Sequence, residues 1–67
     1  MLVYEITLRG RFTRSLSVAF ADFQPRTTAG QDTVLRGDLA DQAALQGVLT
    51  RAMRLGLEIV EVHECRE

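Results

Sequence analysis

The chain has 67 residues, of which eight are arginine, none is lysine and nine are acidic, so its formal net charge is −1. This balance argues against a protein that binds nucleic acid or an anionic membrane by general electrostatic attraction. A single α+β domain over residues 1–67 would bury only about 60% of the surface that its unfolded chain exposes, so we expect a small core and association with further copies.

Membrane and secretory segments are not indicated by the sequence pattern. No charged and apolar leader follows Met1, and no apolar run approaches the roughly 18 to 20 residues that span a bilayer. We therefore expect a soluble, cytoplasmic protein. Cys65 is the only cysteine, which excludes an internal disulfide and a structural zinc site of the usual four-ligand kind.

The first predicted element is a half-buried strand over residues 2–9. Its apolar side chains take every second position, which is the period-two pattern of a strand with one covered face: Leu2, Tyr4, Ile6 and Leu8. Gly10 ends this segment.

A short helix is predicted next, after Thr13 or Ser15, since either residue can cap a helix. Apolar residues then recur at three- and four-residue spacing: Leu16, Ala19, Phe20 and Phe23. The pattern favours about two helical turns, while residues 17–20 also fit a strand.

Residues 23–37 predict two strands joined by a turn. Gly30 lies in this turn, where it can adopt a positive φ, and Thr33 and Val34 begin the returning strand. Pro25 has no N–H to donate to a ladder, which places its strand at a sheet edge or at a bulge.

The clearest helix follows, capped by Asp41 or by Asp38 and ended by Gly56. Its apolar residues repeat at positions i, i+3, i+4 and i+7: Leu45, Val48, Leu49 and Ala52. A final strand, "LEIVEVHEC", is rich in β-branched residues.

The predicted order is β-α-β-β-α-β, with a reduced first helix. With antiparallel neighbours and right-handed crossovers this is a compact ferredoxin-like arrangement, in which the helices cover one face of a four-stranded sheet. The alternative leaves residues 16–20 irregular, so that one helix packs on the sheet. Both versions leave one sheet face uncovered.

The uncovered face is the predicted site of self-association. If the apolar side of the first strand meets the helices, Val60 and Val62 should join the same core. The opposite face then mixes β-branched aliphatic residues with opposite charges, which favours an interface over a fully solvated face. Its predicted members are Val3, Glu5, Val34, Arg36, Ile59, Glu61 and His63. Ordinary scatter of apolar surface residues is the alternative.

Three potential metal ligands, Glu61, His63 and Cys65, share one side of the last strand. Successive members are about 6.6 Å apart along a strand, so these three alone cannot form a tetrahedral site, and Glu5 or a second copy would have to contribute. A Cys–His catalytic pair would lack an enclosing pocket on an open terminal strand. We predict no catalytic residue, metal or cofactor, and interpret the segment as polar strand.

The stretch "RGRFTR" groups Arg9, Arg11 and Arg14 into a weak candidate anion site. No RNA-binding aromatic motif or helix-turn-helix accompanies them, so contact with nucleic acid is not expected. The five glycines follow no phosphate-loop pattern, and their spacing suggests turns, one helix end and a close-packed position at Gly47.

Most of the chain, including "YEITLRGRF", "DQAAL" and "LGL", resembles a widespread group of short, uncharacterised bacterial proteins. The group has a Tyr-Glu-Ile strand, an Asp-Gln-Ala-Ala-Leu helix and a Leu-Gly-Leu closing strand. The resemblance implies a fold and no established activity. This chain departs from the group at Leu16 to Phe20, at Gln46 and at Arg54.

Three hypotheses about function follow from these observations. The leading one is a small, non-enzymatic, homo-oligomeric interaction or regulatory module, with a dimer favoured and a protein partner possible. The first alternative is a ferredoxin-like domain that binds a small ligand at a subunit interface, with Arg9, Arg11 or Tyr4 as polar contacts. The second alternative is a small enzyme of the dimeric α/β-barrel kind, or a metal-binding protein that uses His63.

Overall fold

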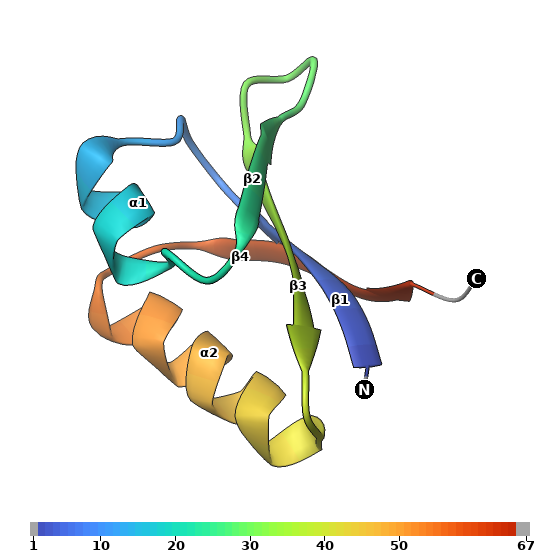
Figure 1. Cartoon of the computed structure of the whole chain (residues 1–67). Helices are drawn as coiled ribbons and strands as arrows, with labels where there is room; N and C mark the ends of the chain where they lie inside the picture. Colours follow the sequence, from blue (N-terminus) through green and yellow to red (C-terminus); the bar gives the residue numbers. More distant parts are fainter. Residues whose placement is uncertain (1, 66–67) are drawn as a thin grey trace.

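The computed structural model describes residues 2–65 as one sheet with two helices (Figure 1). The elements are β1 (Leu2–Leu8), α1 (Arg14–Ala19), β2 (Gln24–Thr27), β3 (Thr33–Leu39), α2 (Gln42–Arg54) and β4 (Ile59–Cys65). The strand order is β2-β3-β1-β4, and every neighbouring pair is antiparallel. The predicted ferredoxin-like fold is thus confirmed, with β1 and β3 in the centre and Pro25 in an edge strand.

Both helices begin at polar caps that the sequence predicts. Thr13 Oγ1 accepts a hydrogen bond from the Leu16 N–H at 3.3 Å, so α1 is a true helix and the irregular alternative is wrong. An Asp41 carboxylate oxygen accepts from the Ala44 N–H at 2.9 Å. Gly56 follows α2 with φ of 76°, a conformation that favours glycine and turns the chain toward β4. Among the described residues, neither helix is long and apolar enough to cross a membrane.

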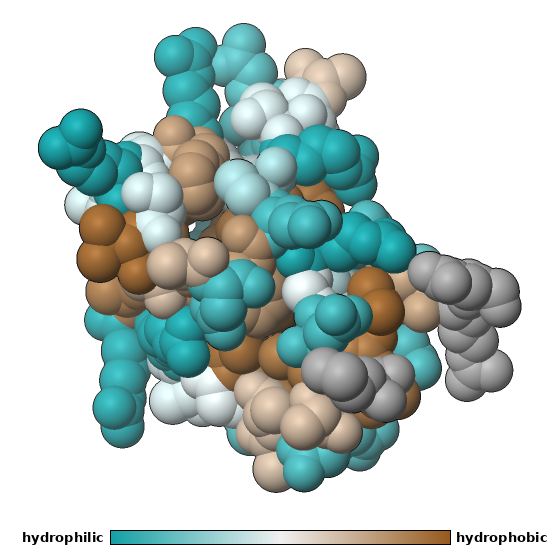
Figure 2. Space-filling model, in the orientation of Figure 1, coloured by the Kyte–Doolittle hydropathy of each residue, from teal (hydrophilic) through white to brown (hydrophobic). Residues whose placement is uncertain are grey.

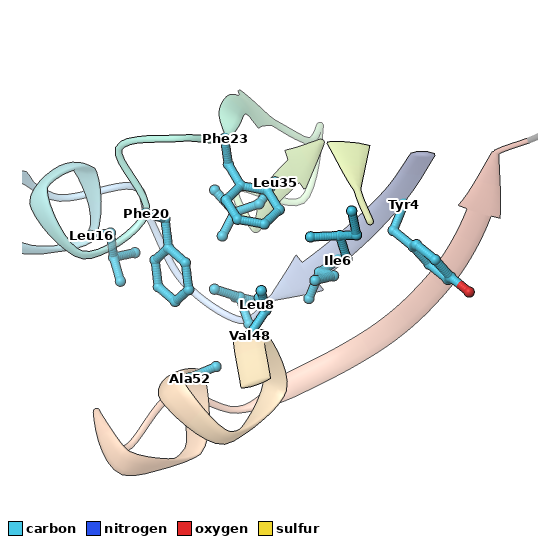
Figure 3. Packing of buried hydrophobic residues seen from close by; sticks show 10 residues of the cluster. Tyr4, Ile6, Leu8, Leu16, Phe20, Phe23, Leu35, Val48 and Ala52 are labelled. Carbon is cyan, nitrogen blue, oxygen red and sulfur yellow. The ribbon is translucent and has the colours of Figure 1, made fainter. Parts of the chain in front are cut away.

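The core lies between the two helices and one face of the sheet (Figure 3). The sheet contributes the alternating apolar residues of β1 and residues of β3. The other side of the core comes from α1, from the segment that follows α1, and from α2. The buried cluster is Tyr4, Ile6, Leu8, Leu16, Phe20, Phe23, Leu35, Leu39, Val48 and Ala52. Arg51 ties the helices together, since its Nη1 donates to the Ala19 carbonyl at 2.9 Å.

Gly37 is the position where the sheet makes room for an aromatic ring. A Cβ atom at Gly37 would lie 2.6 Å from Cδ2 of Phe23, closer than any real contact. At Gly47, by contrast, an added Cβ would meet nothing within 4 Å. The prediction of close packing at Gly47 is therefore wrong, because this residue lies on the exposed side of α2.

A β-bulge at Val60 changes which residues of β4 face the core. Thr7 lies opposite Glu61, but its neighbour Leu8 lies opposite Ile59, so Val60 is the extra residue. Ile59 therefore packs against the core, and its predicted place on the uncovered face is wrong.

The prediction that Val60 and Val62 are core residues is also wrong, because they remain 45% and 39% exposed. Val62 does lie opposite Ile6, on the side of the sheet that faces the helices. However, β4 is an edge strand with a neighbouring strand on one side only, and this position leaves the Val62 side chain partly open to solvent.

Candidate functional site

The uncovered sheet face is built from alternate residues of all four strands, with Gln24 and Arg26 of β2 beside Arg36 and Val34. Residues that lie opposite each other in an antiparallel pair share a face. Across the sheet the rows on this face are Asp38–Val3–Cys65, Arg36–Glu5–His63 and Val34–Thr7–Glu61. The structure thus brings together six of the seven predicted members, namely Val3, Glu5, Val34, Arg36, Glu61 and His63, and leaves out Ile59.

Glu5 is the centre of a charge network on this face. Its Oε2 lies 3.1 Å from Nη1 of Arg36 and 3.6 Å from Nη2 of Arg26. Arg36 Nη1 also donates to Sγ of Cys65 at 3.3 Å. The hydrogen bond to Glu5, followed by the electrostatic interaction with Cys65, raises the pKa of Arg36 above its usual value. Arginine is already charged at every physiological pH, so this shift introduces no pH dependence there.

The face offers less exposed apolar surface than the sequence pattern suggests. Val34 is only 4% exposed, although no helix covers it, because it lies between Thr7 on β1 and Arg26 on β2. Val3 is half-buried. Val3, Val34 and Ile59 therefore form no exposed apolar group, and the face is a polar surface whose central charges, Glu5, Arg26 and Arg36, are paired with one another.

The three potential metal ligands of β4 point to the same face, but they do not converge. Among residues 2–65, no group of three or more histidine, cysteine or acidic side chains could hold a metal ion. Cys65 is a half-buried free thiol beside Arg36, and His63 is exposed opposite Glu5. The arrangement leaves Glu61, His63 and Cys65 spread along the strand, as the rise per residue predicts.

The outer edge of β4 is a more distinctive feature of this sheet than its uncovered face. Within the described chain β4 pairs only with β1, so the backbone groups on its other side face away from the sheet. The opposite edge is formed by β2, which has only four residues and contains Pro25. The edge of β4 has seven residues and is flanked by exposed Val60 and Val62. Figure 2 shows hydrophobic groups scattered among hydrophilic ones on the visible side of the molecule.

The structure separates the three arginines of the candidate anion site. Arg9 and Arg11 line one cavity, whereas Arg14 begins α1 and is absent from its lining. Arg9 is paired with Glu58 at 3.1 Å, and Arg11 Nε donates to Oε1 of Gln31 at 2.9 Å. Tyr4 is buried on the side of the sheet that faces the helices.

These features define a ferredoxin-like α+β domain with one polar open face and a free seven-residue strand edge. The chain belongs to the family described as Domain of unknown function (DUF8691), whose model matches residues 3–63. This match agrees with the resemblance to uncharacterised proteins. No curated protein and no solved structure matches the chain.

Proposed function

We propose that the chain is a small, non-catalytic interaction module that forms a homodimer through the outer edge of β4. The observation that carries this proposal is the free seven-residue edge, with Val60 and Val62 exposed beside it. Beyond the bulge at Val60, the edge from Glu61 to Cys65 is a ready template for main-chain hydrogen bonds with another strand. Two copies joined in this way form one continuous eight-stranded sheet.

The side chains of β4 favour one register for this pairing. In an antiparallel pair related by a two-fold axis normal to the sheet, one residue lies opposite its own copy. With Val62 at the axis, Glu61 lies opposite His63 of the partner subunit, and the symmetry repeats this pair. With Glu61 at the axis, two carboxylates face each other instead. With His63 at the axis, two imidazoles do so. The Val62 register is therefore favoured.

From the size of the contact we expect a weak, transient dimer. One edge strand from each subunit gives an interface at the small end of specific complexes, below about 1,200 Å² in total. Such a dimer would have a dissociation constant on the order of 10 μM. This suits a module whose assembly responds to its concentration.

Replacing His63 with Glu should weaken the dimer about tenfold or more. The change turns two favourable cross-strand pairs with Glu61 into two pairs of like charge, each pair contributing up to about 1 kcal/mol. Sedimentation velocity of both proteins over about 1 to 200 μM measures the two dissociation constants.

Gln24→Glu is the matched control, because it makes the same change in net charge on the opposite edge strand β2. It should leave the dimer intact. Thermal unfolding at the lowest concentration separates an effect on assembly from one on the fold, since His63 also lies opposite Glu5 within the chain. Wild-type protein that stays monomeric at 200 μM, or equal weakening by both variants, would contradict the proposal.

A further inference from the structure

A cavity of about 200 Å³ lies between the loop after β1, the start of α1 and the segment after α2. One part of its wall is cationic and the other is apolar. Its lining residues are Arg9, Arg11, Thr13, Ser15, Leu16, Leu55 and Leu57. We call it the arginine–leucine cavity. It contains no residue of β4, so it is separate from the proposed dimer edge.

The loop that carries the two arginines is held in place by the turn between β2 and β3. The Gly10 N–H donates to Oδ1 of Asp32 at 3.0 Å, and Oγ1 of Thr33 donates to the Gly10 carbonyl at 2.8 Å. Arg11 Nε donates to the side chain of Gln31 at 2.9 Å. Since these contacts fix the backbone on both sides of Gly10, little ordering is needed when a ligand binds.

The cationic part of the wall retains an uncompensated charge. Arg9 is paired with Glu58, which offsets its charge in part. Arg11 contacts the neutral amide of Gln31, and among the described residues no carboxylate lies within salt-bridge distance of it. Its Nη groups can therefore bind one oxyanion with both charge and hydrogen bonds.

The apolar part of the wall includes a leucine that the fold leaves uncovered. Leu16 is buried and belongs to the core, but Leu55, just after α2, is 52% exposed. A volume of about 200 Å³ holds roughly six or seven groups of the size of a water molecule or a methylene. A short aliphatic tail would fill this space and cover Leu55.

We infer that the arginine–leucine cavity binds a small aliphatic monocarboxylate of about six carbons in total, with its carboxylate at Arg11 and its tail against Leu55 and Leu57. Nucleotides and sugars are too large and too polar for this cavity. Simple inorganic anions would leave its apolar wall exposed. The ligand class therefore follows from the pairing of one free guanidinium with a short apolar wall.

Titration of ¹⁵N-labelled protein with sodium hexanoate at constant ionic strength tests this inference. Amide shifts should concentrate in residues 9–16 and 55–57, with a dissociation constant on the order of 1 mM, as expected for a ligand of eight non-hydrogen atoms. Hexanol, which lacks the charge, and phosphate, which lacks the tail, should each bind at least about fivefold more weakly.

Arg11→Gln should weaken hexanoate binding at least about fivefold, and Leu55→Asn should do the same. Arg14→Gln is the matched control, because it removes the same charge from a nearby residue outside the cavity lining. Absence of shifts at about 20 mM hexanoate, equal binding of phosphate, or equal weakening by Arg14→Gln would each overturn the inference. Because β4 takes no part, these outcomes are independent of the dimer measurement.

Discussion

Phe20→Ala is expected to lower the free energy of unfolding by about 3 to 5 kcal/mol, the usual range for removing a buried aromatic side chain. Phe20 is 1% exposed and follows α1 directly. Its ring meets the ring of Phe23 edge-on, with centroids 6.1 Å apart, and the Arg51 guanidinium lies 5.5 Å from its centroid. The side chain thus lies where α1, α2 and the sheet meet, so its removal leaves a cavity within the core.

This loss is a large fraction of the total stability. At about 0.05 to 0.15 kcal/mol per residue, a domain of this size has roughly 3 to 10 kcal/mol. Urea unfolding followed by circular dichroism should therefore find Phe20→Ala partly or wholly unfolded at 25 °C. Val18→Ala, within the neighbouring α1 but at a residue that is 75% exposed, should change stability by less than about 0.5 kcal/mol. A loss below about 1 kcal/mol for Phe20→Ala would show that α1 does not close the core.

Gly37→Ala and Gly47→Ala are expected to change stability in opposite directions. At Gly37 the new methyl group would lie 2.6 Å and 2.7 Å from two atoms of the Phe23 ring, which is buried and cannot turn away cheaply. Overpacking of this kind costs about 1 to 3 kcal/mol. At Gly47 the methyl group meets open space within a helix, so alanine should stabilise by about 0.5 to 1 kcal/mol.

The reason for the Gly37 effect can be tested separately from its size. In a Phe23→Ala background, Gly37→Ala should cost much less, because the ring that it strikes has been removed. Four urea unfolding curves give the coupling free energy between the two positions. Equal costs in both backgrounds would mean that the close approach of the Phe23 ring is not the cause of the loss, since Gly37 has no positive φ that would itself require glycine.

Much of the fold could be predicted from local patterns in the sequence. The alternation in residues 2–9 identifies the buried side of β1: of the four predicted residues, Tyr4, Ile6 and Leu8 are core residues, and Leu2 is partly buried against the core. Asp41 and Gly56 mark the two ends of α2 because capping depends on nearby backbone groups alone. Pro25 marks an edge strand for an equally local reason.

Other features of the fold depend on which strands and segments pair in three dimensions, so local sequence patterns could not predict them. A bulge inserts one residue without changing the β-branched composition of β4, so the positions of Ile59 and Val60 were predicted wrongly. Arg26 was missed as a partner of Glu5 because the register of β2 on β3 decides which residue lies beside Val34. Gly37 lies under Phe23 only because the segment after α1 folds back over β3.

The candidate sites were predictable to different degrees. The common face of Glu61 and His63 follows from the two-residue period, and their spread along the strand follows from its rise. The cavity could not be predicted, because its lining joins Arg9 and Arg11 to Leu55, which is distant in sequence. The only sign of this cavity in the sequence is the cluster of three arginines. The cluster alone does not indicate which of the arginines lie beside apolar residues.

Edge pairing of β4 is the central claim, and a mixture of two charge variants tests it most directly. In the Val62 register, Glu61→Arg and His63→Glu each destroy the match between Glu61 and the partner's His63, so each variant alone should be mainly monomeric where wild-type protein is mainly dimeric. In an equimolar mixture the arginine introduced at position 61 of one subunit faces the glutamate introduced at position 63 of the other, and a Glu61–His63 pair is restored beside it, so the mixture should sediment mainly as a dimer. Wild-type protein should do so at the same concentration of about 50 μM. A mixture that stays monomeric where wild-type protein is dimeric would contradict this register, and a monomeric wild-type protein would contradict edge pairing itself.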